Sequence, residues 1–483
     1  MDTDSKKAML IYPCGKLFQR GEDRCQGNID DSTATAMRAC NDLGYSAAVL
    51  EKMGYEIFLR DYQTEKKNFE DVKSDINNFR PDILLISVTN ATIFQDISFA
   101  KNIKGIYPLV CIVLKGAIFY DPDSKLLECL DLDCISYLIG GETELCIGEI
   151  AEYEHKKTGD ISSVDNILFR DETGSFQKTK FHTWCEDLDS IPFPARKYMN
   201  NSLYTRPDTG EPMATIQTSR GCSASCIYCL SPLISGKRIR YRSPENVLAE
   251  LLECYNTFNI KNFFFKADTF TMNAEWIKSL CHKILASPLK GKISFTANSR
   301  VSPLDRETLA LMKSCGCFAV AFGFESGSDE TLKKIKKGTT VQQNLAAVKW
   351  AKELKIPIYG FFMIGFPWET EKHLKMTREH VFAINADFIE IHVALPYYGT
   401  EFYKICEENN ILNESTLGSD YFNSNITGTS SVSIESLMAF RNKLILDYYL
   451  RPSYIFLRIA DCIKSPQKFF KYAKYACRIV KNS

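Results

Sequence analysis

Over the first 150 residues, short apolar runs alternate with helical patterns. The apolar runs predict five strands, which are Ala8–Tyr12, Tyr55–Leu59, Ile83–Val88, Val110–Leu114 and Ser136–Ile139. The stretches between them predict helical pieces, which are Thr33–Leu43, Ala47–Met53, Phe69–Asn78, Ile97–Ile103 and Ser124–Leu130. Continuous apolar strands joined by helices are typical of a parallel, doubly wound sheet. Residues 1–150 are therefore expected to form one α/β domain that binds its ligand at the carboxyl ends of the strands.

The strand–helix alternation returns in residues 212–400. Six strands are predicted, at Ala214–Thr218, Asn262–Lys266, Ser294–Ala297, Ala319–Phe324, Ile358–Ile364 and Phe388–Ala394. The helices between them are expected to begin near Ser243, Ala274, Asp305, Val341 and Thr370. Six such units with right-handed crossovers predict a partial (βα)6 barrel rather than the full eight. Its catalytic groups belong at the carboxyl ends of the strands.

Two further regions complete the chain. Residues 151–211 are expected to be a linker, with a hairpin over Asn166–Lys180 and a rigid, proline-rich connector at Asp187–Pro194. Residues 401–483 are expected to be mostly helical, with helices over Ile434–Tyr449 and Pro466–Val480. Residues 401–433 are expected to close over the pocket.

Composition narrows the class of protein. The chain has 483 residues, enough for about three domains, and its 45% hydrophobic and 24% charged residues are an ordinary globular balance. Basic and acidic residues number 59 each, so no bulk charge favours nucleic acid. The N-terminus is not a signal-peptide pattern, and no apolar run reaches the ~18 residues of a spanning helix. Together with 18 cysteines, this predicts a reducing, cytoplasmic location.

Three of these cysteines, Cys222, Cys226 and Cys229, lie within eight residues, directly after Ser219-Arg220-Gly221. Three thiolates on one loop can hold three irons of a cubic 4Fe–4S cluster, whereas most ferredoxin-type clusters are closed by four cysteines. A fourth iron would then be open to a ligand. Chance clustering and a zinc site remain alternatives, although structural zinc usually takes four ligands in two pairs. The next cysteine, Cys254, lies in a predicted helix.

The spacing of three and then two residues, with Tyr228 before the last cysteine, resembles the signature of radical S-adenosylmethionine enzymes. This resemblance implies that Cys222, Cys226 and Cys229 are the metal ligands and the catalytic centre. It also implies that the open iron binds the amino and carboxylate groups of S-adenosylmethionine (SAM), with Tyr228 near the adenine.

Polar or glycine-rich clusters follow each later strand of the predicted barrel. They are Lys266–Thr269, Asn298–Arg300, Gly323–Gly327, Ile364–Glu369 and Pro396–Thr400. One such cluster alone is typical of a turn, but five at the same place in successive units indicate a shared ligand site. Asp268, Arg300 and Glu325 are the polar candidates for SAM, the last two suited to its hydroxyls and carboxylate. Gly365 would let backbone approach the adenine closely.

The motifs Gly-Phe-Glu-Ser-Gly-Ser, Ile-Gly-Phe-Pro-Trp-Glu and Pro-Tyr-Tyr-Gly-Thr deepen this resemblance. They are similar to the fourth-, fifth- and sixth-strand motifs of the radical SAM subgroup that has an N-terminal cobalamin-binding domain. That subgroup contains the class B radical methyltransferases and the anaerobic porphyrin-ring cyclases. Three positions depart from its usual pattern, at Ser223, at Ala267-Asp268 and at Tyr398, and none is a cluster ligand.

For cobalamin, the resemblance points to Thr89, Gly116 and Gly141, whose alternative role is to form turns at the sheet edge. All six histidines lie outside residues 1–150, so no imidazole of that domain can coordinate cobalt. His392, in the last strand, is the one histidine worth following. Glu142 and Glu144 could equally cap the next helix.

The function implied is a radical SAM enzyme that, with cobalamin, methylates an unactivated carbon of a small-molecule or lipid substrate. A non-methylating radical cyclase, oxidase or rearranging enzyme is the alternative, and an iron–sulfur electron carrier is the alternative from another class. The partners expected are the substrate and an external one-electron reductant, flavodoxin or ferredoxin, but no nucleic acid. The basic amphipathic helix at the C-terminus could lie on a membrane, but packing of its apolar side on the barrel is favoured.

Overall fold

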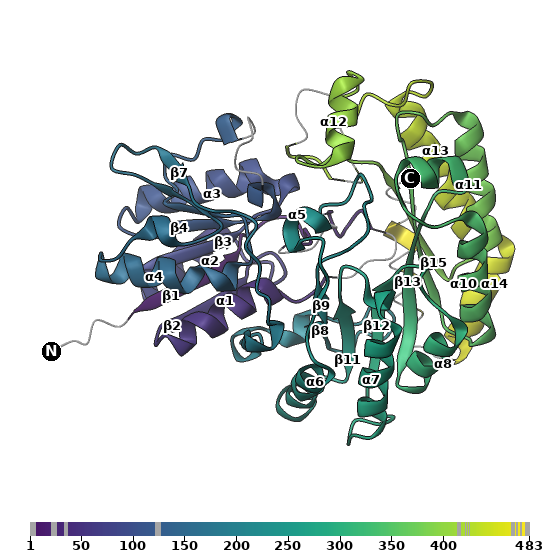
Figure 1. Cartoon of the computed structure of the whole chain (residues 1–483), viewed down its shortest axis with the longest axis horizontal. Helices are drawn as coiled ribbons and strands as arrows, with labels where there is room; N and C mark the ends of the chain where they lie inside the picture. The colour runs from purple at the N-terminus through teal and green to yellow at the C-terminus, as the bar shows by residue number, and fades with distance from the viewer. Residues whose placement is uncertain are drawn as a thin grey trace.

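The computed structural model describes residues 6–20, 27–32, 37–120, 127–412, 417–420, 422, 424, 426–464, 469, 472–473 and 476–478. Two sheets lie side by side, each with helices packed against it, and the helical C-terminal region covers the far side of the second sheet (Figure 1). The predicted α/β class, with a parallel sheet, a partial barrel and a helical C-terminal region, is confirmed.

The first sheet has the strand order β2-β1-β3-β4-β5-β6-β7. Its first five strands are parallel, and the last two add antiparallel at the β5 edge. The strands are β1 (Lys7–Tyr12), β2 (Glu56–Asp61), β3 (Ile83–Ser87), β4 (Cys111–Lys115), β5 (Tyr137–Ile139), β6 (Ile167–Arg170) and β7 (Phe176–Lys178). The main helices are α1 (Asn41–Lys52), α2 (Phe69–Phe79), α3 (Ile93–Ile106) and α4 (Ile147–Lys156). The central strands β3 and β4 are buried throughout, as their apolar runs predict, and each ends in a buried polar residue, Ser87 or Lys115.

Helix α1 differs from its prediction. One helix replaces the two expected pieces, and residues 37–40 before it are not helical. Its polar residues Asp42 and Ser46 are buried, so the helix lacks the solvent-facing polar stripe that marks a helix in sequence. Of the predicted helix Ser124–Leu130, residues Leu127–Cys129 form a single 3₁₀ turn and residues 124–126 lie outside the described residues.

The second sheet is the partial barrel, with six parallel strands in the order β15-β14-β13-β12-β11-β8. They are β8 (Met213–Gln217), β11 (Asn262–Lys266), β12 (Ser294–Ser299), β13 (Cys317–Glu325), β14 (Ile358–Ile364) and β15 (Phe388–Val393). The helices of this region are α5 (Ser231–Ser235), α6 (Pro244–Phe258), α7 (Ala274–Leu285), α8 (Arg306–Ser314), α9 (Asp329–Lys334), α10 (Val341–Glu353) and α11 (Glu371–Ile384). A two-stranded ribbon, β9 (Ser219–Arg220) with β10 (Arg240–Tyr241), flanks the cysteine loop. Buried aromatic side chains fill the core, and Phe265 stacks on Phe295 with 4.4 Å between ring centroids.

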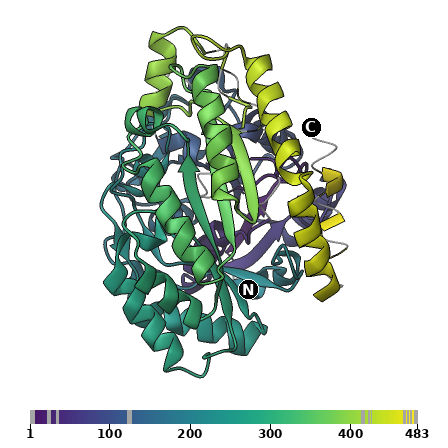
Figure 2. The same ribbon diagram turned by 90° about the vertical axis from the view of Figure 1, so that its right-hand side faces the viewer.

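The C-terminal helices are α12 (Glu401–Glu408), α13 (Ile434–Tyr449) and α14 (Pro452–Lys464). Helix α13 packs against the edge strand β15 (Figure 2). Pro452 begins α14 rather than only ending the helix before it, because proline is tolerated in the first turn of a helix. Most of the predicted helix Pro466–Val480 lies outside the described residues. None of the described helices is long and apolar enough to cross a membrane.

The carboxyl ends of β3, β4 and β5 face the barrel. Asn90, after β3, accepts a hydrogen bond from the backbone of Gly418 at 2.9 Å. The short 3₁₀ helix after β4, Ala117–Tyr120, shares an apolar cluster with α5. The fold thus brings the predicted ligand edge of the first domain against the segment that carries the three cysteines.

Candidate active site

The cysteine loop leaves β9 through a glycine that no other residue could replace without strain. Gly221 has φ +93°, and a Cβ there would lie 2.0 Å from the carbonyl oxygen of Arg238. Its amide donates to the Asp268 carboxylate at 2.8 Å. The amide of Cys222 then donates to Gly236 O at 3.1 Å. The start of the loop is therefore fixed from both sides.

All three loop cysteines line one cavity of about 1280 Å³, part of which opens to solvent. Cys222 Sγ lies 3.7 Å from Thr269 Oγ1, and Cys229 Sγ lies 3.3 Å from Ser231 Oγ. No group of three His, Cys, Asp or Glu side chains within the described ranges is arranged to hold one metal ion. A cubic cluster offers a separate iron to each thiolate, so its three ligands need not converge on one point.

All three polar residues predicted to meet SAM line the same cavity, namely Asp268, Arg300 and Glu325. Arg300 reaches the cysteine loop, where its Nη1 lies 3.6 Å from Cys226 Sγ. Asp268 is committed to the Gly221 amide, so part of its role is to hold the loop.

Glu325 lies at a bulge near the end of β13, where it adopts φ +62°. Its Oε1 accepts from Lys337 Nζ at 2.6 Å. Burial raises the pKa of Glu325, but the charge of Lys337 and hydrogen bonds from Lys337 and Tyr228 outweigh burial, so the net pKa lies below its ordinary value. Glu325 is thus a carboxylate at neutral pH. Lys337 had no sequence signal, because it lies in the loop after α9 and belongs to no motif.

Tyr228 lines the cavity as predicted, and its ring lies 6.0 Å from that of Phe366. Gly365 is not among the cavity-lining residues. Its backbone has φ +95°, and a Cβ at this position would lie 3.1 Å from Val393 Cγ1. Local backbone conformation and packing therefore account for the glycine. Its amide donates to buried Glu369 at 2.8 Å, and that carboxylate holds the turn after β14 together.

At another part of the cavity, residues of the N-terminal domain meet the last barrel strand. Gln19 and Arg38 come from the first domain, and Glu390 and His392 come from β15. His392 Nε2 lies 3.4 Å from Glu390 Oε2. His392, the histidine singled out in the sequence, thus lies in the cavity wall. Gln19, Arg38 and Glu390 had no sequence signal, because only the packing of the two domains brings them here.

The residues predicted to meet cobalamin lie at the sheet edge that faces the barrel, but they do not line this cavity. Buried Thr89 caps the short helix after β3 by accepting from the Ala91 amide at 3.1 Å. A Cβ on Gly116 would lie 2.7 Å from Val88 Cγ2, and one on Gly141 would lie 2.5 Å from Asn166 Cβ. Both glycines are therefore required by packing within the domain, and cobalamin contact at these three positions stays a prediction.

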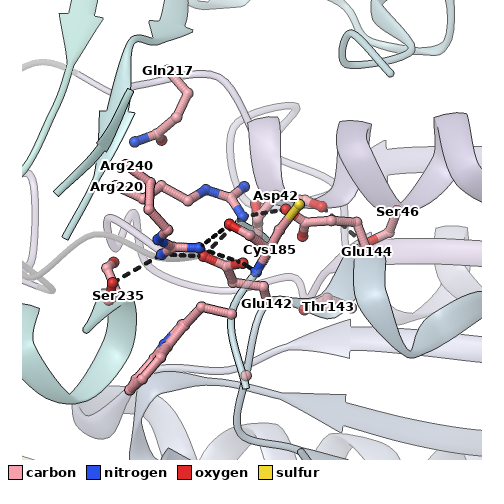
Figure 3. Close-up of polar contacts among 12 residues, drawn as sticks. Asp42, Ser46, Glu142, Thr143, Glu144, Cys185, Gln217, Arg220, Ser235 and Arg240 are labelled. Carbon is pink, nitrogen blue, oxygen red and sulfur yellow. Dashed lines mark hydrogen bonds and ion pairs between the residues drawn. The ribbon is translucent and has the colours of Figure 1, made fainter. Parts of the chain in front are cut away.

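A buried cluster of ion pairs joins the two domains beside the cysteine loop (Figure 3). Glu142 of the first domain accepts from Arg240 Nη2 at 2.7 Å and from the Cys185 amide at 2.7 Å. Arg220, two positions before Cys222, pairs with Glu142 at 3.3 Å and also with Glu144. Neither carboxylate caps the helix that follows it, so the capping role expected as an alternative is not observed.

Comparison with known proteins fits this geometry. Residues 216–381 match the family model described as the radical SAM superfamily. An uncharacterized methyltransferase of Pyrococcus horikoshii is 30% identical over 411 residues, 85% of this chain and 87% of that one. The cytidylyl-2-hydroxyethylphosphonate methyltransferase of Streptomyces wedmorensis is 25% identical over 83% of this chain and 82% of its own.

A relative of another activity is also similar. The anaerobic magnesium-protoporphyrin IX monomethyl ester cyclase of Cereibacter sphaeroides is 24% identical over 69% of this chain and 55% of its own. Among solved structures, the cobalamin-dependent SAM radical enzyme OxsB, with aqua-cobalamin and SAM bound, superposes with a TM-score of 0.72. The match covers 99% of this chain and 72% of OxsB at 16% identity, which shows the shared fold. The chain belongs to the radical SAM superfamily and is a radical SAM enzyme.

Proposed function

We propose that this enzyme uses a 4Fe–4S cluster, SAM and cobalamin to methylate an unactivated carbon of a small-molecule or lipid substrate. The observation that carries the proposal is the shared cavity. One space is lined by the three loop cysteines, by the polar ends of barrel strands and by residues of the N-terminal domain. The names of the two methyltransferase relatives support the same reaction.

The residues present fit a cluster with one open iron. Cys222, Cys226 and Cys229 would hold it, and Arg300 lies near enough to the Cys226 sulfur to offset negative charge there. When bound, the cluster would supply the electron that cleaves SAM, and cobalamin would supply the methyl group. The chain's own part is to bind, to orient and to exclude water, as in other cofactor enzymes.

For SAM, the fixed carboxylate of Glu325 is a ready acceptor for hydroxyl or ammonium donors. Lys337 holds its position and charge, so it needs no reorganisation when ligand enters. Tyr228 offers an aromatic surface beside the cysteines for an adenine. Each of these proposed roles rests on the chemical type of the side chain and on its position in the site.

For cobalamin, the argument is the position of the first domain next to the cavity. Its 3₁₀ helix Ala117–Tyr120 packs in one apolar cluster with Leu230, Leu395 and Tyr397, three residues that also line the cavity. A cofactor on the carboxyl edge of the first sheet would therefore be next to the reaction space. A cytoplasmic location and an external flavodoxin or ferredoxin as reductant belong to this proposal.

The test is an anaerobic reaction of the reconstituted protein with hydroxocobalamin, a titanium(III) reductant and SAM carrying a deuterated methyl group. A small-molecule and lipid extract supplies the substrate pool. We expect S-adenosylhomocysteine, 5′-deoxyadenosine and a mass-shifted product together. Deoxyadenosine with no labelled product would overturn methyl transfer and favour the cyclase, oxidase or rearranging class. Intact SAM under reduction would favour an electron carrier.

A further inference from the structure

Helix α14 (Pro452–Lys464) turns Tyr454 and Arg458 toward the protein and leaves its large aliphatic side chains and Phe456 exposed to solvent. Tyr454 is buried, and its hydroxyl donates to Asp387 O at 2.9 Å. Arg458 is mostly covered and pairs with Asp387 at 3.3 Å and with Asp461 at 3.2 Å. A helix that only packs on a soluble core has the opposite arrangement.

Exposed apolar side chains gather on and around this helix. Eleven large hydrophobic residues are exposed among the described residues, and seven of them lie between positions 450 and 469. These seven are Leu450, Ile455, Phe456, Leu457, Ile459, Ile463 and Phe469, with exposed fractions of 40 to 77%. Ile455, Ile459 and Ile463 are four residues apart and so form one stripe. A contiguous apolar patch of this kind marks an interaction surface.

The charges at the helix and in the sequence after it indicate what covers the patch. Two acids lie at this helix, Asp387 beneath it and Asp461 on it, and both pair with Arg458. After Asp461 the sequence contains no acidic residue and five lysines, at positions 464, 468, 471, 474 and 481. An exposed apolar helix face followed by lysines is suited to the interface of an anionic bilayer, where each basic residue near the surface adds attraction.

We propose that α14 lies in the headgroup region of an anionic membrane, with its apolar stripe toward the acyl chains. The yellow C-terminal helices run along one outer edge of the barrel in Figure 2, and α14 contacts α13 there. The contact is peripheral and lies in the plane of the membrane. It depends on none of the residues that line the cavity, so it stands or falls separately from the methyl-transfer proposal.

Vesicle flotation of the full-length protein tests the contact. The vesicles are phosphatidylcholine containing about one-third phosphatidylglycerol. The test variant is the triple substitution Phe456→Gln, Ile459→Gln and Ile463→Gln, which keeps good helix formers. The matched control is Leu109→Gln, because Leu109 is 97% exposed on the first domain and far from α14 in sequence. We expect the wild type and the control to float, the triple variant to bind at least about tenfold more weakly, and added salt to release the protein.

Three results would overturn the proposal. The wild type could fail to float, the triple variant could float as well as the wild type, or binding to pure phosphatidylcholine could equal binding to the anionic vesicles. Light scattering after size exclusion provides a second measurement. A wild-type dimer that the triple substitution converts to monomer, with no flotation of either, would assign the patch to a second copy of the chain instead.

Discussion

Substitution of Glu142 by glutamine removes one charge from the buried cluster between the domains while keeping the shape of the side chain. Glu142 is 2% exposed and lies 98 positions from Arg240 in sequence. Glutamine retains one carbonyl acceptor but removes the carboxylate charge that pairs with both Arg220 and Arg240. We expect both the stability of the protein and the order of the cysteine loop to fall.

The size of the effect follows from distance and burial. At 2.7 Å and an effective dielectric constant of about 20, the Glu142–Arg240 attraction is about 6 kcal/mol before the cost of burying the charges. Measured losses on breaking a buried pair are about 3–5 kcal/mol. Because glutamine keeps a hydrogen bond, we expect a decrease of about 3 kcal/mol in the free energy of unfolding.

Denaturant unfolding measures that loss, and hydrogen exchange over residues 221–236 measures the loop. The control is Asp96→Asn, which breaks the equally buried Arg20–Asp96 pair (2.7 Å) within the first domain. Both variants should lose stability, but only Glu142→Gln should speed exchange in the loop and change the EPR spectrum of the reduced cluster. Loop exchange that is unchanged in Glu142→Gln, or equally faster in both variants, would refute the idea that this carboxylate positions the cysteine loop.

Three more predictions follow from the site. Gly221→Ala should destabilise the protein by about 1–3 kcal/mol and lower its iron content, whereas Gly174→Ala, at φ +83° with nothing near its Cβ, should cost only backbone strain and leave iron unchanged. Burial raises the pKa of Glu369 to about 7 despite backbone hydrogen bonds, so its contribution to stability is present below the ordinary pKa and is lost as pH rises through 7. The wild type should therefore lose about 3 kcal/mol of unfolding free energy between pH 4.5 and 8, and Glu369→Gln, which cannot titrate, should lack this pH dependence. Urea unfolding across this pH range measures it, and the same pH profile in both proteins would contradict the reasoning. Cys226→Ala should abolish cluster absorbance after anaerobic reconstitution, while Cys254→Ala, buried in α6, should keep it.

The sequence by itself determined the two βα regions and the strand ends that line one cavity. Apolar runs such as Ile83–Val88, interrupted only by Ser87, favour burial on both faces of a sheet, so their pattern predicts a central strand without tertiary information. The cysteine loop and the strand ends at Asp268, Arg300 and Glu325 are local signals, and parallel strands bring such ends to one edge. The three side chains accordingly meet in one cavity.

Only the tertiary structure decided which distant groups act on one another. Packing makes neighbours of Glu142 and Arg240, and it brings Gln19 to the cavity beside the barrel strands. Such packing leaves no periodic trace in the sequence. Helix α1 was misplaced because Asp42 is buried with Lys115, and the outward apolar face of α14 reverses the usual pattern. Periodicity records whether a side chain prefers water, whereas the partner that satisfies a buried charge or covers an exposed apolar face is fixed by the fold and its surroundings.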